Sequence, residues 1–172
     1  MLTEEQEEWI NHLSDTDHVS VVPFDQHCEA EFTKIKKAIQ DVVGNQQAVL
    51  HRGASALGIS GQDEIDVYVP VGEEDFDNTA KALARAFGEP QSHYPQKRAR
   101  FSVRLEGKRI DIFVINKHDD DWKNSERFYY FLQSHKDVLE AYRKLKEDAA
   151  GQSVRDYYRT KIIFINDVLA QS

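Results

Sequence analysis

The sequence is short of the residues that would place the protein outside the cell, in a membrane or around a zinc ion. Its 172 residues include one cysteine, Cys28, which cannot form an internal disulfide and has no second cysteine with which to bind zinc. The apolar runs are too short to cross a bilayer, and the N-terminus is acidic, whereas a signal peptide begins basic and then becomes apolar. We therefore expect a cytoplasmic protein without a membrane partner.

Positive charge is also scarce. There are 22 lysines and arginines against 30 aspartates and glutamates, which gives a formal net charge of −8. Proteins that coat nucleic acids depend on dense lysine and arginine, so no nucleic-acid partner is expected. Part of the acid, such as the stretch over residues 119–121, is predicted to lie in solvated loops. The hydrophobic content of 40% is too high for general disorder.

What the sequence does contain is a set of alternating strands followed by amphipathic helices. A hairpin turns at Glu106 and Gly107. Strands are predicted over residues 19–22, 64–69, 101–105 and 109–114, and helices over residues 3–14, 29–43, 74–87, 124–133, 136–149 and 153–170. This order predicts an α+β protein with a single domain over residues 1–172. In it, C-terminal helices over about residues 119–172 pack on an α/β core over about residues 15–118.

Three carboxylates stand out because of their positions on the predicted strands. Residues i and i+2 of a strand point to the same face, so Glu64 and Asp66 lie together, and Asp111 occupies the polar face of a later strand. If the two strands are neighbours, the three carboxylates meet and repel one another unless a cation lies among them. Mg²⁺ or Mn²⁺ suits such oxygen ligands, which substrate phosphates can complete. The alternative is the ordinary solvated face of an antiparallel strand.

A glycine-rich loop over residues 53–61 precedes the acidic strand. Glycine at position 53 lets backbone N–H groups approach a phosphate closely, and the hydroxyl of Ser55 is a further donor. Arg52 could either hold a phosphate or pair with an acid. The loop has neither the Gly-Lys-Ser/Thr ending of a Walker A motif nor the GxGxxG spacing. The loop therefore supports anion binding only in combination with the acids.

The remaining candidates have ordinary explanations. Lys97, Arg98 and Arg100 form the one dense basic cluster, which could meet a triphosphate or an acidic partner but is predicted to be a solvated loop. His51 is predicted to be a packed or hydrogen-bonded strand histidine rather than a metal ligand. Lys146 is predicted to be an exposed helix lysine.

The loop, the acid-hydrophobic-acid strand and the later strand acid together resemble the nucleotidyltransferase (polymerase-beta-like) superfamily. The wider chain is similar to one branch of it, the GrpB family. Residues 21–25 resemble the opening of that family, residues 51–55 its His-x-Gly-Ser-Thr loop, and residues 65–67 its acidic strand. The chain departs from the family pattern at four places. Tyr129 and Tyr130 replace an Arg-Asp pair, and residues 57–59 keep only part of a Pro-Gly-Leu stretch. The other two departures are Glu64, which replaces an apolar residue, and Asp111, which replaces a histidine. Both changes restore the acid triad of active nucleotidyltransferases.

The resemblance implies a nucleotidyltransferase-like mixed or antiparallel sheet flanked by helices, with a C-terminal helical segment. It implies that Glu64, Asp66 and Asp111 bind Mg²⁺ or Mn²⁺ and catalyse transfer of a nucleoside monophosphate to a hydroxyl of an unidentified small molecule or protein. The predicted contacts to the nucleoside triphosphate come from Gly53, Ser55 and Arg52. The alternatives are a nucleotide-binding module without turnover and a protein-interaction module, which apolar residues on the last helix would favour.

Overall fold

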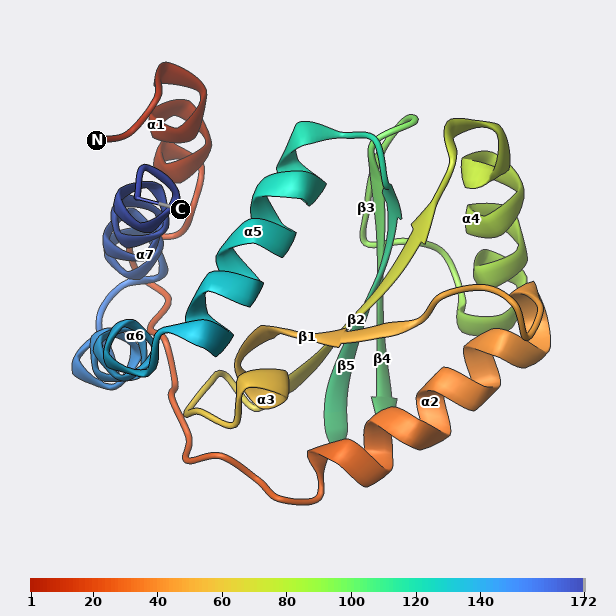
Figure 1. The fold of residues 1–172 in the computed structure, drawn as a ribbon, viewed down its shortest axis with the longest axis horizontal. Coiled ribbons are helices and arrows are strands. Elements are labelled where there is room, and N and C mark those ends of the chain that lie inside the picture. The colour runs from red at the N-terminus through yellow and green to blue at the C-terminus, as the bar shows by residue number, and fades with distance from the viewer. Residues whose placement is uncertain (172) are drawn as a thin grey trace. The chain divides into compact units, whose positions relative to one another are not determined.

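The computed structural model describes residues 1–171, which form two compact units (Figure 1). The first unit comprises residues 1–23, residues 60–62 and the chain from Asn124 onward, and the second comprises Phe24–Ile59 and Asp63–Lys123. The second unit contains the sheet, and the first is built mainly from helices. The N-terminal residues group with the C-terminal helices in this division. The single domain expected over residues 1–172 stays a prediction.

The sheet of the second unit has five strands in the order β1-β2-β5-β4-β3. The strands are β1 (Leu50–Arg52), β2 (Glu64–Val71), β3 (Ser92–Tyr94), β4 (Arg98–Leu105) and β5 (Lys108–Asn116). β2 and β5 are parallel, and every other neighbouring pair is antiparallel. The prediction of an α+β protein with a mixed or antiparallel sheet is therefore confirmed, and the sheet is mixed. The acidic strand and the return strand of the hairpin are direct neighbours.

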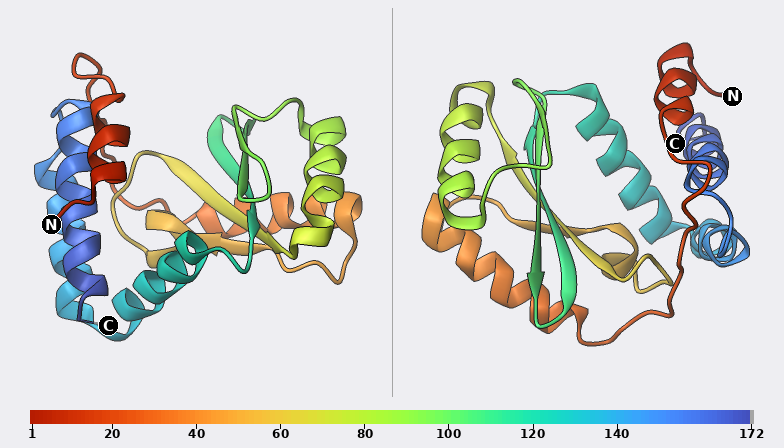
Figure 2. Two further views of the ribbon diagram at one scale, coloured as in Figure 1. Left: turned by 90° about the horizontal axis from the view of Figure 1, so that it is seen from above. Right: turned by 180° about the vertical axis from the view of Figure 1, so that it is seen from behind.

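Two helices, α2 (Cys28–Val43) and α4 (Glu73–Phe87), cover one face of this sheet (Figure 2). Along β2 every second residue is buried, because its side chain packs beneath these helices. The buried core includes Phe32, Ile39, Ile65, Val67, Val69, Phe76, Leu83, Ile110, Ile112 and Val114. The intervening residues of β2 and β5, including the predicted acids, point to the opposite face.

The helices of the first unit are α1 (Glu4–Asn11), most of α5 (Asp120–Ser134), α6 (Lys136–Asp148) and α7 (Val154–Leu169). α1 lies beside α7 (Figure 1). Aromatic rings fill the space among the later helices: the ring of Tyr142 stacks on Phe164 at 5.4 Å, and Phe128 meets both rings edge-on. No helix within residues 1–171 is both long enough and apolar enough to cross a membrane.

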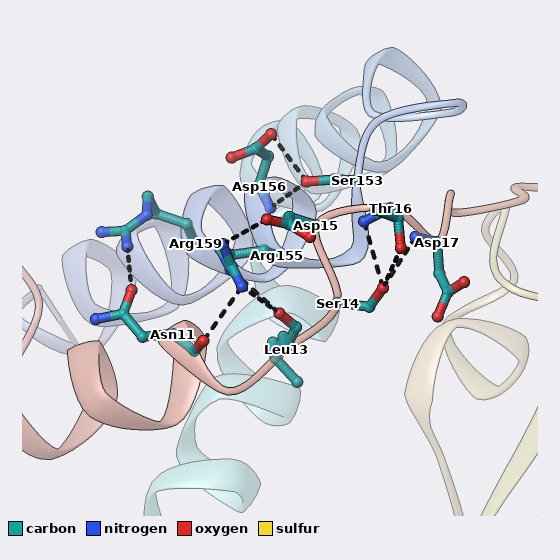
Figure 3. A network of polar contacts seen from close by, with 10 residues as sticks. All are labelled: Asn11, Leu13, Ser14, Asp15, Thr16, Asp17, Ser153, Arg155, Asp156 and Arg159. Carbon is teal, nitrogen blue, oxygen red and sulfur yellow. Dashed lines mark hydrogen bonds and ion pairs between the residues drawn. The ribbon is translucent and has the colours of Figure 1, made fainter.

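Two arginines of α7 fix the N-terminal segment through a polar network (Figure 3). The guanidinium of Arg155 donates to the carbonyl of Leu13 through Nε at 3.1 Å and Nη2 at 2.9 Å. It also donates to the carbonyl of Asn11 at 3.2 Å and to the carboxylate of Asp15 at 3.1 Å. Arg159 donates to the side-chain oxygen of Asn11 at 3.4 Å. The donors of Arg155 are thus taken up by the chain that passes over α7.

Most predicted elements are present, but several segments differ from the prediction. Residues 19–22 form no strand, and Val22 makes only an isolated bridge with Gly61. The short strand β3 lies in a segment for which no strand was predicted. The acidic stretch was predicted to be a loop, but its last two residues form the first turn of α5, where the helix dipole favours negative charge.

Candidate functional site

The face of the sheet opposite α2 and α4, here called the polar face, brings the predicted acids to neighbouring positions. Asp66 of β2 is paired directly with Asp111 of β5. Asp111 in turn faces Ser102 of β4, and Asp66 faces Arg52 of β1. Cross-strand partners share a face, and adjacent strands lie about 4.8 Å apart, so these four side chains form one row across the sheet.

Asp111 is the most deeply buried member of this row. Its side chain is only about 5% exposed, and its Oδ1 accepts a hydrogen bond from Ser102 Oγ at 2.6 Å. The backbone N–H of Ser102 donates to the side-chain oxygen of Gln91 at 2.5 Å. A carboxylate that is both buried and bonded on one oxygen has a fixed orientation, so Oδ2 is the oxygen that can interact with another group.

The third acid, Glu64, belongs to the next row, where its cross-strand partner is Arg109. The Nη2 atom of Arg109 forms an ion pair with Glu64 Oε2 and lies 3.7 Å from Asp111 Oδ2. The protein therefore supplies its own cation between two of the three predicted ligands. Within residues 1–171, no three side chains of His, Cys, Asp or Glu are grouped as a metal cluster.

Gly53 approaches the carboxylate of Asp66 so closely that only glycine fits. Its φ is +74°, which favours glycine, and a Cβ added there would overlap Asp66 Oδ2. Gly53 opens the short helix α3 (Gly53–Leu57), which replaces the first part of the predicted loop. The need for glycine at this position is thus explained by Asp66, while the predicted contact with phosphate stays a prediction.

Arg52 and Ser55 point to different surroundings. Arg52 is buried in the row of Asp66, and its Nη1 donates to the carbonyl of His51 at 2.8 Å. Ser55 Oγ lies 2.9 Å from His51 Nε2 instead. Because His51 and Arg52 are successive residues of β1, their side chains point to opposite faces of the sheet. The structure therefore separates the Ser55 hydroxyl from the row of acids.

His51 is packed and hydrogen-bonded, as predicted. Its ring stacks on Phe32 at 4.7 Å, and its Nδ1 lies 3.2 Å from Glu29 Oε2. Burial lowers the pKa of His51, so the ring is neutral at pH 7, although the Glu29 carboxylate opposes this shift. A carboxylate only accepts, so the proton of the ring lies on Nδ1 and Ser55 donates to Nε2.

Several residues of the site and its surroundings were missed or misplaced by sequence reasoning. The roles of Ser102 and Arg109 depend on strand register, which no local pattern reveals. The basic residues Arg98 and Arg100 lie in β4 rather than in a loop. Lys146 is buried, not exposed, and its Nζ donates to the Tyr157 hydroxyl at 3.2 Å. Only the alternation of the hairpin strands could have indicated that the two arginines share a face.

Comparison with known proteins gives one family and a shared fold. The model of the GrpB family ("GrpB protein") matches residues 18–171. A crystal structure of the conserved protein GrpB from Enterococcus faecalis is similar with a TM-score of 0.70 and 18% sequence identity, over 88% of this chain and 95% of that chain. A structure of a GLD-2/RNP-8 complex is similar with a TM-score of 0.54 and 12% identity, over 98% of this chain and 64% of that chain. No curated protein matches the sequence.

Proposed function

This chain belongs to the GrpB family and has a nucleotidyltransferase-like fold, and we propose that it binds a metal-bound nucleoside triphosphate on the polar face. The observation that supports this most is the direct pairing of Asp66 with Asp111 on adjacent parallel strands. Two carboxylates one strand spacing apart repel each other, and a bound cation would offset this repulsion together with Arg109, which stands 3.7 Å from Asp111. A cytoplasmic location, where nucleoside triphosphates are available and Cys28 stays reduced, is part of the proposal.

The donor set fits a hard divalent cation. Mg²⁺ is usually held by one or two carboxylates, with water and substrate phosphates as the other ligands, so a third protein carboxylate is not required. Asp66 and Asp111 would hold Mg²⁺ or Mn²⁺, and Ser102 would keep Asp111 in orientation. When bound, the metal would neutralise charge on the phosphate oxygens. Glu64 could bind the metal as a third ligand only if its ion pair with Arg109 were broken.

Transfer of a nucleoside monophosphate to a hydroxyl is the catalytic form of this proposal. The acceptor hydroxyl must lose its proton as it attacks, and Asp111 Oδ2 is the carboxylate oxygen on the polar face best fixed to take it. Pyrophosphate would leave. A second candidate is binding without transfer. It is favoured by Arg109, whose guanidinium already neutralises Glu64 and stands beside Asp111.

Titration calorimetry and thermal shift with MgATP, MgGTP, MgCTP and MgUTP test the proposal. At a ligand concentration one hundred times Kd, binding stabilises the folded state by about 2.7 kcal/mol, which is a rise of several degrees in Tm. We expect at least one nucleotide to produce this shift and EDTA to remove it. Asp66→Asn and Asp111→Asn should each weaken binding more than tenfold, because a neutral amide is a poor ligand for a hard cation.

The matched control is Asp77→Asn, which neutralises an exposed acid of α4. Each variant is compared with its own ligand-free Tm, so that a change in stability is not mistaken for a change in binding. Unchanged nucleotide affinity in both site variants would overturn the proposal. Pyrophosphate release with added hydroxyl acceptors then separates the candidates, since binding without release identifies the non-catalytic module.

A further inference from the structure

Arg98 and Arg100 lie side by side on the polar face. They are two residues apart in β4, so their side chains point to the same side of the sheet, and both are half-buried. The cross-strand partner of Arg100 is Phe113 and that of Arg98 is Ile115. Two guanidinium groups are therefore held in line along one strand, with apolar neighbours on β5.

Neither guanidinium is satisfied by the rest of the protein. The Nε atoms of Arg98 and Arg100 are buried and have no hydrogen-bond acceptor. Among residues 1–171, no side-chain or carbonyl oxygen forms a hydrogen bond or an ion pair with either guanidinium. Their neighbours on the hairpin differ, since Arg104 donates to the carbonyl of Gly107 at 3.0 Å, and Arg109 pairs with Glu64 through Nη2 although its Nε also lacks an acceptor. Buried donors without an acceptor in the protein are rare, and each needs an explanation, of which an anionic ligand is one.

The surroundings of the two arginines fix their stems without supplying an acceptor. The Arg98 guanidinium lies 5.2 Å from the centroid of the Tyr94 ring. On the other side, the Phe113 ring stacks on Tyr68 at 4.7 Å. Aromatic and aliphatic neighbours hold a guanidinium by stacking and desolvation, and they leave its N–H fork available for an anion. The acceptor must therefore come from outside the chain.

We infer that Arg98 and Arg100 bind the phosphate chain of the nucleotide, as two forks that receive its non-bridging oxygens. This inference rests on the proposed function for the identity of the ligand. Arg100 is the diagonal neighbour of Asp111 across β4 and β5, a separation of about 7–8 Å between side-chain positions. A polyphosphate held by a metal at Asp66 and Asp111 lies within reach of Arg100, and Arg98 extends the same line.

A short polyphosphate fits this pair better than other anions do. Arginine presents its N–H groups as a planar fork that matches two phosphate oxygens, and such charge-assisted bonds are stronger than those between neutral groups. Two forks in line match a ligand with two or more phosphates. A nucleic acid needs a much larger basic surface, which a chain of net charge −8 lacks.

The test uses inorganic tripolyphosphate without metal, measured by titration calorimetry at low salt with the full chain. We expect wild-type protein to bind it, and Arg98→Gln and Arg100→Gln each to weaken binding about tenfold. Arg85→Gln, which removes an exposed arginine of α4, is the matched control and should bind like wild type. Arg100→Lys keeps the charge but loses the fork, so binding should fall between the wild-type and Arg100→Gln values.

The outcomes separate this inference from the proposed function. Arginine-dependent binding of tripolyphosphate supports the arginine site even if no nucleotide binds. Failure of wild-type protein to bind tripolyphosphate overturns the inference, whatever the nucleotides do. The inference is also overturned if Arg85→Gln and Arg100→Gln weaken tripolyphosphate binding equally, because that would indicate a general attraction to positive charge. Nucleotide binding that depends on Asp66 but not on Arg98 or Arg100 would support the proposed function and overturn the inference of an arginine site.

Discussion

The arginines of α7 and those of β4 have the same chemistry but opposite surroundings. Arg155 donates to two carbonyls and one carboxylate, and Arg159 pairs with Glu7 at 2.7 Å. Arg98 and Arg100 have buried Nε atoms and no such acceptors within residues 1–171. Each pair lies within its own compact unit. A folded chain normally satisfies its buried donors, so the second pair needs a different explanation from the first.

The arginines of α7 stabilise the fold, whereas those of β4 are available to bind a ligand. Removing Arg155 leaves two backbone carbonyls without a donor, which costs stability. Removing Arg100 leaves no group of the protein without a partner, so the cost falls on ligand binding instead. Substituting an arginine of α7 should therefore lower stability, whereas substituting an arginine of β4 should weaken ligand binding.

The largest effect on stability is expected from Arg155→Met, which keeps the apolar stem and removes every donor. Loss of the bonds to Leu13 and Asn11 should lower the free energy of unfolding by about 2 kcal/mol, because unsatisfied acceptors retain their desolvation cost. Urea unfolding followed by circular dichroism measures it. Lys136→Met, at an exposed cation of α6, is the control. Equal midpoints for the two variants would contradict the comparison.

A smaller loss of stability is expected from Gly53→Ala. This substitution tests whether the stability of the polar face depends on the fit of its backbone rather than on its arginines. The new methyl group must displace the Asp66 carboxylate, and the alanine must keep a left-handed φ. Together these should lower the free energy of unfolding by about 1–2 kcal/mol. Gly58→Ala separates the two causes, since Gly58 has a φ of +69° but nothing within 4 Å of an added Cβ. If overlap with Asp66 matters, Gly53→Ala should unfold at lower urea than Gly58→Ala.

The smallest effect is expected from the double variant Arg98→Gln, Arg100→Gln. Because both guanidiniums lack acceptors in the described chain, its free energy of unfolding without ligand should stay within about 0.5 kcal/mol of wild type. The same urea experiment measures it beside Arg155→Met. A loss as large as that of Arg155→Met would show that the β4 arginines are structural and would remove the contrast.

Local patterns were enough to predict the helices over α2 and α4 and the alternating strands of the hairpin. Alternation also placed Glu64 and Asp66 on the face away from the core. These features depend on periodicity within a few residues, which the sequence displays directly. The short strand β3 was missed because prolines flank it and it has only three residues, too few to show alternation.

The contacts that define the candidate site were beyond sequence reasoning because they depend on register between distant strands. Asp66 meets Asp111 through a parallel pairing of β2 with β5, across more than forty residues of chain. The same register places Arg109 opposite Glu64, and the two side chains form an ion pair that no local pattern predicted. The burial of Lys146 likewise depends on how α6 meets α7, not on the local sequence.

The register of the sheet also sets a local charge that the composition conceals. The polar face carries arginines at positions 52, 98, 100, 104 and 109 and acids at positions 64, 66 and 111, so its formal charge is +2 on a chain of −8. A patch of opposite sign focuses the electric field that an approaching ion meets at short range. An anionic ligand is thus repelled at a distance and attracted on arrival. Added salt, which screens the distant repulsion first, should therefore not slow its association as steeply as it does for a uniformly basic protein.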